Sequence, residues 1–225
     1  MRSDERTGVL AKILNVNMKA SDYYRYKEMS LATCRAKRTF DVVGSLLGLI
    51  LFSPAFLVIY CLIKREDNGP AIFKQERIGY GGKPFTLYKF RSMAVTSESD
   101  GKPVLCQKND KRLTKIGRFL RDHHLDELPQ LWNVLKGEMS IVGPRPERKF
   151  FVDKIKAINP SYVLLYQLRP GLFSLATLYN GYTDTMEKML ERLRMDLEYL
   201  HNCSLWLDLK IIYLTVFSIL SGKKF

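Results

Sequence analysis

The chain has 225 residues, of which 46% are hydrophobic and 26% are charged, and its formal net charge is +13. Its length is about one and a half times that of a typical domain, so one domain with additions is expected. The composition excludes a disordered chain and a collagen-like chain. The excess of lysine and arginine favours a partner that carries phosphate: nucleic acid, anionic lipid or a phosphorylated small molecule.

The longest uncharged stretch runs from residue 42 to residue 63. As a helix it would reach roughly 33 Å, enough to cross a hydrocarbon core that is about 30 Å thick. A single membrane span therefore fits the length. The same stretch argues against a DNA-binding protein, so no nucleic acid is expected as a partner.

Two features of this stretch favour a membrane helix that enters and leaves on the same face. Arginine and lysine flank both of its ends, and such residues favour the cytoplasmic side. Near its middle, Pro54 has no N–H to donate and would bend the helix, while the hydroxyl of Ser53 is able to bond a freed backbone group. We therefore predict a re-entrant membrane helix over 37–65, broken at Ser53 and Pro54, after a polar and basic N-terminal extension over 1–36.

Residues 66–225 carry the patterns of a small α/β body that is rich in helix. Strand-like runs over 71–77 and 84–93 flank a glycine-rich turn and predict a short β-hairpin. Helical spacing of apolar residues covers 113–136 and 184–202.

The last apolar stretch, residues 203–220, also has helical spacing, with Asp208 and Thr215 on a narrow polar stripe opposite the apolar residues. Two interpretations fit this pattern: a buried core helix, or an amphipathic helix that lies in the membrane interface. Lys223 and Lys224 follow directly and would suit anionic headgroups.

Asp126 and Glu127 stand at the start of a stretch with helical spacing of leucine and tryptophan. Because proline is tolerated only in the first turn of a helix, Pro129 predicts that this helix begins near Asp126. A helix N-terminus suits a bound phosphate and should keep an aspartate ionised, and adjacent carboxylates are able to supply a nucleophile, a base or a metal ligand. The same pair also fits an aspartate N-cap followed by a first-turn glutamate, which only stabilises the helix.

Three basic residues are candidates for binding phosphate. Arg145 stands between Pro144 and Pro146, which restrict the backbone and would present its guanidinium rigidly to phosphate oxygens. By strand alternation Lys89 and Arg91 share one face, where they would form a wall of a diphosphate pocket. A solvated turn and a solvated strand face explain the same residues without a ligand.

Taken together, these motifs resemble those of the bacterial sugar transferases, the monotopic phosphoglycosyl transferases that begin the assembly of surface polysaccharides and glycoconjugates. They occur in the order of that family and cover about residues 35–225. The matching segments are residues 37–41, Ser53 with Pro54, and residues 75–79, 89–93, 125–134, 137–146 and 169–171.

The resemblance implies that residues 66–225 form a catalytic domain that ends in an interfacial helix. It also implies that the reaction proceeds in two steps. The nucleophile it implies is Asp126, with Glu127 beside it as a base or metal ligand and Mg²⁺ as the cofactor. The aspartate would attack the β-phosphate of a UDP-sugar, release UMP and pass the phosphosugar to undecaprenyl phosphate. Arg145 would contact the phosphates or the nucleotide.

The resemblance also implies a location on the cytoplasmic face of the bacterial inner membrane, against a bilayer with anionic headgroups, and it is compatible with a homo-oligomer. A rival hypothesis is a non-catalytic scaffold at the membrane surface that binds a nucleotide or a lipid phosphate. Such a scaffold would keep the basic residues and the membrane helix but would have no use for Asp126. Release of UMP from a UDP-sugar separates the two hypotheses.

Overall fold

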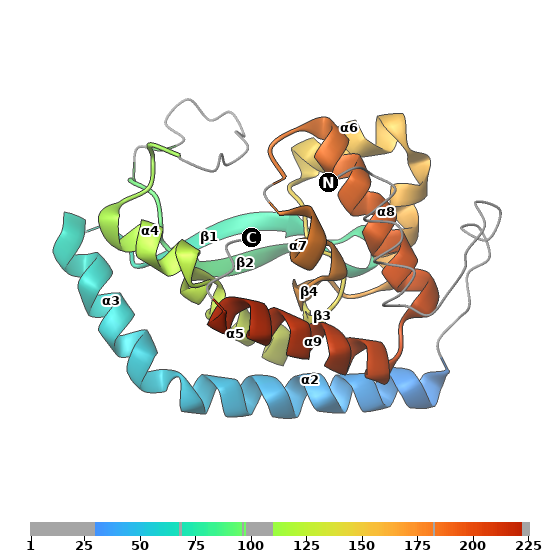
Figure 1. Ribbon diagram of the computed structural model, residues 1–225, viewed down its shortest axis with the longest axis horizontal. Coiled ribbons are helices and arrows are strands. Elements are labelled where there is room, and N and C mark those ends of the chain that lie inside the picture. The colour runs from blue at the N-terminus through green and yellow to red at the C-terminus, as the bar shows by residue number, and fades with distance from the viewer. Residues whose placement is uncertain (1–29, 68, 96, 98–109, 182, 222–225) are drawn as a thin grey trace.

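The computed structural model describes residues 30–67, 69–95, 97, 110–181 and 183–221 (Figure 1). The described chain is mostly helical and carries two small two-stranded sheets, which confirms the expected α-rich α/β fold. Its first elements are α2 (Leu31–Leu51), α3 (Ser53–Asp67), β1 (Ile72–Ile78), the 3-10 turn η2 (Tyr80–Gly82), β2 (Pro84–Phe90), α4 (Lys115–Asp122) and the 3-10 turn η3 (Leu125–Glu127). They are followed by α5 (Gln130–Lys136), β3 (Ser140–Val142), α6 (Lys149–Ile158), the 3-10 helix η4 (Pro160–Gln167), β4 (Gly171–Phe173), α7 (Leu175–Asn180), α8 (Met186–Asn202) and α9 (Leu205–Leu220).

The uncharged stretch folds as two helices, α2 and α3. The chain bends by 60° from the direction of the first helix to that of the second. The hydroxyl of Ser53 donates a 2.8 Å hydrogen bond to the carbonyl of Ile50, the group that would have bonded residue 54 if Pro54 had an N–H. The break predicted at Ser53 and Pro54 is therefore confirmed. Among the described residues no helix is long and apolar enough to span a membrane alone, although the bent pair qualifies by length and composition.

The start of the first helix differs from the predicted boundary. α2 begins at Leu31, before residue 37, because the hydroxyl of Ser30 caps the backbone N–H of Thr33. Residues 1–29 of the predicted N-terminal extension lie outside the described residues. The helix that carries the uncharged stretch therefore also includes several residues assigned to the extension.

The predicted hairpin is present as an antiparallel pair of strands, β1 and β2, in which Gln75 lies opposite Leu87. The turn between them has positive φ angles at Gly81 and Gly82, a conformation that glycine adopts without strain. The second strand ends at Phe90, so the last residues of the predicted run over 84–93 leave the sheet. A second sheet pairs β3 and β4 in parallel.

The stretch with helical spacing over 113–136 forms two α-helices separated by a 3-10 turn. α4 ends at Asp122, His124 takes a left-handed backbone conformation with φ of 56°, and Pro129 occupies the position before α5. Since Pro129 has no N–H, it cannot continue an α-helix from Leu125, and the dyad segment closes as a 3-10 turn. The helical backbone thus begins at Leu125, close to the predicted start near Asp126, but its first turn is 3-10 and the α-helix itself begins at Gln130.

The interior divides into two clusters of apolar side chains. The larger gathers around β3, α6, η4 and α8, and its largest fully buried side chain is Tyr199. The smaller lies between the bent helix, the hairpin and α4, where the rings of Phe56 and Phe90 are 5.3 Å apart. This smaller cluster attaches α3 to the strand that leads to the candidate site.

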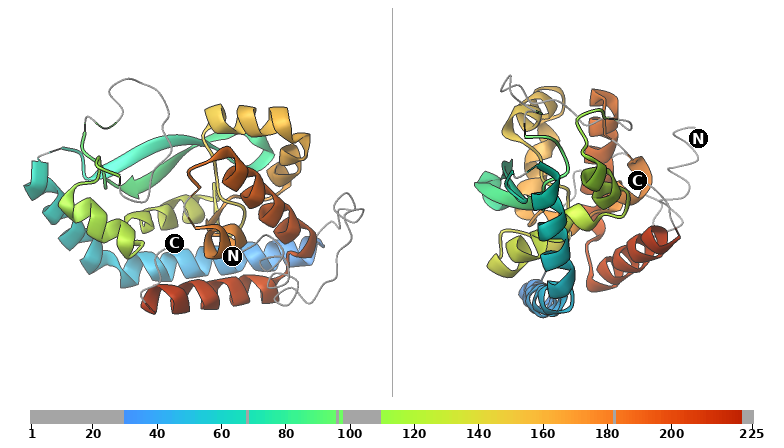
Figure 2. Two further views of the ribbon diagram at one scale, coloured as in Figure 1. Left: turned by 45° about the horizontal axis from the view of Figure 1, so that its top comes forward. Right: turned by 90° about the vertical axis from the view of Figure 1, so that its left-hand side faces the viewer.

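The last helix, α9, runs beside α2 (Figures 1 and 2), and the ammonium of Lys37 bonds the carboxylate of Asp208 between them. Asp208 and Thr215, which form the polar stripe of the sequence, are buried, whereas Trp206 and Phe217 are exposed. α9 therefore shows parts of both predicted interpretations, because its polar stripe faces the body and much of its apolar surface faces outward.

Candidate active site

The two adjacent carboxylates lie in η3, between α4 and α5. Asp126 is 6% exposed, and the side chain of Glu127 is 14% exposed. Both elements that flank the turn pack against the rest of the body, since Leu120 of α4 and Val134 of α5 are buried. The pair therefore lies on a short, supported turn rather than on a solvated helix end.

Glu127 binds two cations that come from distant parts of the sequence. Nη2 of Arg145 donates to its Oε1 at 2.6 Å, and Nη1 approaches its Oε2 at 3.4 Å. Nζ of Lys89 donates to the same Oε1 at 2.9 Å. The structure thus brings together four predicted site residues, Asp126, Glu127, Lys89 and Arg145, in what we call the dyad cluster.

Burial and the neighbouring charges shift the pKa values of the two carboxyl groups of the dyad cluster in opposite directions. Burial raises the pKa of Asp126, the charge of Glu127 adds to the rise, and Lys89 opposes it. Burial also acts to raise the pKa of Glu127, but Arg145 and Lys89 outweigh it and hold that pKa well below its usual range. The expected stabilisation of ionised Asp126 by a helix N-terminus is not what the structure shows. The group that favours its ionised form is the charge of Lys89, which acts against the effect of burial.

Arg91, the remaining predicted residue, lies apart from these contacts. It follows the end of β2, its backbone N–H bonds the carbonyl of Ala71, and its side chain is buried against Gly69. The alternation argument places Lys89 and Arg91 on one face, but the strand ends between them. Lys89 turns to Glu127, whereas Arg91 packs at the base of the hairpin.

The loop that carries Arg145 is held by charged residues that the sequence analysis did not single out. Asp196 lies close to the backbone of Arg145 and to Arg192, and burial raises the pKa of Asp196 to about 7. Glu147 bonds Arg192 at 2.6 Å and Arg77 at 3.2 Å.

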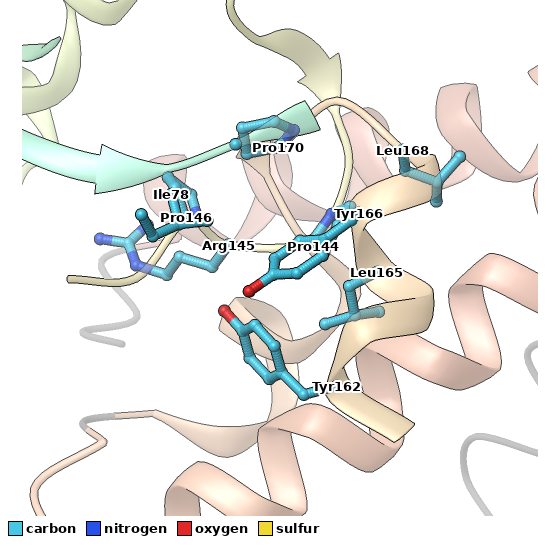
Figure 3. Close-up of a pocket in the computed structure, with 10 residues that line it drawn as sticks. Ile78, Pro144, Arg145, Pro146, Tyr162, Leu165, Tyr166, Leu168 and Pro170 are labelled. Atoms are coloured by element: carbon cyan, nitrogen blue, oxygen red, sulfur yellow. The ribbon is translucent and has the colours of Figure 1, made fainter. Parts of the chain in front are cut away.

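A shallow hollow that is open to solvent lies beside Arg145, between its loop and η4 (Figure 3). Pro144 and Pro146 form one side, and the hydroxyls of Tyr162 and Tyr166 point toward each other at its edge. This hollow presents aromatic and proline surface next to Arg145.

The described residues contain no group of three or more histidine, cysteine, aspartate or glutamate side chains arranged to hold a metal ion. Mg²⁺ is usually held by one or two carboxylates together with phosphate oxygens and water. Asp126 and Glu127 supply that number of carboxylates, and within the described part of the chain Oε2 of Glu127 has only a long, 3.4 Å contact with Arg145. The donor set fits Mg²⁺ when a substrate provides phosphate oxygens.

Comparison with known proteins assigns the chain to a family. The sequence model of the bacterial sugar transferase family matches residues 32–222. A UDP-glucose:undecaprenyl-phosphate glucose-1-phosphate transferase of Klebsiella pneumoniae is 49% identical over 183 residues, which are 80% of this chain and 39% of the relative. A UDP-N-acetylgalactosamine-undecaprenyl-phosphate N-acetylgalactosaminephosphotransferase of Aeromonas hydrophila is 41% identical over 83% of this chain and 44% of its own length.

A third relative covers more of its own length. A UDP-glucose:undecaprenyl-phosphate glucose-1-phosphate transferase of Caulobacter vibrioides is 46% identical over 82% of this chain and 70% of the relative. The chain thus spans about two fifths of the length of the first two relatives and a larger share of the third. The matched region contains the bent helix pair, the dyad cluster and the loop of Arg145. The chain belongs to the bacterial sugar transferase family.

Proposed function

We propose that this chain transfers a sugar 1-phosphate from a UDP-sugar to undecaprenyl phosphate and releases UMP, as the first membrane step in the synthesis of a surface polysaccharide or glycoconjugate. The names of the relatives support the substrate class. The observation that carries the proposal is the dyad cluster, where a buried aspartate lies beside a glutamate that holds a lysine and an arginine. Two cations at this place suit a diphosphate substrate.

In the first step a carboxylate oxygen of Asp126 attacks the β-phosphorus of the UDP-sugar. The bond from that phosphorus to the bridging oxygen breaks, UMP leaves with the oxygen, and an acyl phosphate joins Asp126 to the sugar phosphate. In the second step a phosphate oxygen of undecaprenyl phosphate attacks the same phosphorus, and the Asp126 carboxylate leaves. Two displacements through a covalent intermediate replace one difficult displacement.

The other members of the dyad cluster orient the substrate and offset its charge. Glu127 holds Lys89 and Arg145 side by side, so their positive charges lie where the phosphates bind. When it is bound, Mg²⁺ would be held by Asp126 and Glu127 with phosphate oxygens and would neutralise charge on the departing UMP.

A lipid acceptor requires the site to lie at a membrane, and we propose that the bent pair α2 and α3 is re-entrant from the cytoplasmic face of the bacterial inner membrane. Both helices α2 and α9 turn their polar residues inward: Asp41, Ser45 and Asp208 are buried, while Leu47 and Phe217 are exposed. This pattern is the reverse of a soluble surface helix and suits contact with acyl chains. Basic residues at both ends of the pair suit anionic headgroups.

The mechanism is tested by incubating purified wild-type protein with UDP-sugars and Mg²⁺ in the absence of undecaprenyl phosphate. Intact-protein mass spectrometry should then show one added sugar phosphate, and UMP should appear. D126N keeps the size of the side chain but removes the nucleophile, so it should show neither the adduct nor turnover. D153N is the matched control, since Asp153 is an exposed aspartate that pairs with Lys149. Substantial turnover by D126N would refute the mechanism, and binding of UDP-sugar without UMP release would favour the scaffold.

The topology is tested separately by labelling cysteines with a membrane-impermeant maleimide. The native Cys34 is exposed and precedes the uncharged stretch, and R65C places a second probe beyond it. With the other cysteines replaced by serine, neither probe should react from outside intact cells, and both should react in inverted membrane vesicles. Reaction of one probe alone from outside would mean that the pair spans the membrane.

A further inference from the structure

Asn133 makes an unusual connection between α5 and the hairpin. Its side chain is fully buried, its Nδ2 donates to the carbonyl of Thr86 at 2.7 Å, and its Oδ1 accepts the backbone N–H of Tyr88 at 3.1 Å. Both backbone groups belong to β2. A side-chain amide that bonds the carbonyl of one residue and the N–H of the second residue along reproduces the pairing of a neighbouring strand.

These two bonds occupy the free edge of β2. The strand has one paired neighbour, β1, and at Thr86 and Tyr88 the backbone groups that bond Asn133 point away from it. A slip of β2 by one residue against α5 would turn its side chains to the opposite face. The bidentate contact therefore sets the register of β2 on α5 at a point one residue before Lys89.

The amide of Asn133 is itself held in one orientation. The carboxylate of Glu138 accepts a 2.7 Å hydrogen bond from Nδ2 of Asn133, and Lys136 in turn donates to Glu138 at 2.6 Å. With Nδ2 committed to two acceptors, Oδ1 faces Tyr88. The asparagine therefore acts as a fixed coupling between the helix that follows the dyad and the strand that carries the lysine.

We propose that Asn133 is a positioning residue that holds Lys89 against Glu127, by docking β2 onto α5 in a single register. Along β2, Leu87 and Lys89 share a face: Leu87 packs into the core with Val134, and Lys89 reaches Glu127 at 2.9 Å. Without the amide contact, the free edge of the strand loses the two side-chain hydrogen bonds by which Asn133 ties it to α5. The catalytic consequence rests on the proposed function, whereas the placement of Lys89 does not.

The first experiment measures that placement without using activity. A water-soluble carbodiimide activates a carboxylate, and an amine within contact distance displaces the activating group to form an amide. The 2.9 Å pair of Lys89 and Glu127 should give such a cross-link in the wild-type protein, detected by peptide mass spectrometry. N133A should lose most of it. The matched control is N180A, because Asn180 is also buried and bonds a backbone carbonyl, that of Lys188, at 2.7 Å away from the dyad cluster.

The second experiment separates positioning from general destabilisation. Misplacing a group that contacts substrate by about 1 Å costs about 100-fold in turnover, so N133A should lower kcat by about that factor while it stays folded. K89M should be impaired as well. If Asn133 acts through Lys89, the double variant N133A/K89M should be no slower than K89M, because the two changes then affect one unit.

The outcomes are distinct. A wild-type level of the cross-link in N133A, or equal slowing of the wild type and of K89M by the Asn133 substitution, would overturn the proposal. Loss of the cross-link in N180A as well would assign the effect to general destabilisation and would also overturn it. If no UDP-sugar yields UMP with the wild type, the proposed function fails, while the cross-link still decides the role of Asn133. N133D, which keeps the size and the acceptor toward Tyr88, replaces N133A in both experiments if N133A does not fold.

Discussion

Substituting Asp41 with alanine should destabilise the protein strongly, because Asp41 joins the bent helix pair to the strand that leads to Arg145. Asp41 is 2% exposed and lies on the inner face of α2. Its Oδ1 accepts the hydroxyl of Ser140 at 3.0 Å and the backbone N–H of Ile141 at 2.9 Å, both in β3. Val43, two residues after Asp41 in α2, lies on the exposed face of the same helix. The carboxylate is therefore the polar contact between the helix and the start of β3.

The magnitude follows from the groups that D41A leaves behind. Both donors lie in a buried environment, and each buried donor without an acceptor costs about 1–3 kcal/mol. The free energy of unfolding should therefore fall by about 2–6 kcal/mol, a large part of the stability of a typical domain. In a protein of this size that corresponds to a fall of the melting temperature of at least about 4 °C.

The assay is thermal unfolding of purified protein in detergent, followed by tryptophan fluorescence. S45A is the matched control: Ser45 is also buried on α2, but its hydroxyl donates only within the helix, to Val42. This control should lose about 1 kcal/mol or less. D41N, which keeps an acceptor oxygen, should fall between the two. A melting temperature of D41A equal to that of S45A would refute the reasoning that Asp41 anchors β3.

Three further predictions concern the charged groups of the site. R145A should lower UMP release strongly but the melting temperature only slightly, since Arg145 is partly exposed and contributes charge rather than packing. A large fall in the melting temperature, with normal activity in the protein that remains folded, would contradict this. Because burial raises the pKa of Asp126, the acidic limb of the pH–rate profile should lie above the ordinary aspartate value of about 3.9, and a limb at or below that value would count against an attacking Asp126. Burial raises the pKa of Asp196 from its ordinary value of 3.8 to about 7, so the folded protein holds this proton more tightly than the unfolded chain. The resulting stabilisation is fully present below pH 3.8 and is lost as the pH rises through 7. Melting temperatures between pH 4 and pH 8 should therefore fall for the wild type and change less for D196N, whose neutral amide does not titrate.

Local features of the fold were predictable from the sequence because covalent geometry determines them. Pro54 lacks an N–H in any environment, so the helix had to break there, and Ser53 was the nearest hydroxyl able to bond the freed carbonyl. Gly81 and Gly82 permit positive φ angles, so the hairpin turn lies where the glycines are. The family motifs also identified the dyad and Arg145, but not how they contact each other.

The tertiary structure alone decided which groups meet. Lys89 and Glu127 are 38 residues apart, and Asp41 and Ile141 are 100 apart, so neither contact follows from any local pattern. The outward apolar face of α9 and the contacts of Asn133 with β2 likewise depend on neighbours brought by the rest of the chain. The physical reason is that burial and long-range pairing set the free energy of a polar group, and both arise only when the whole chain has folded.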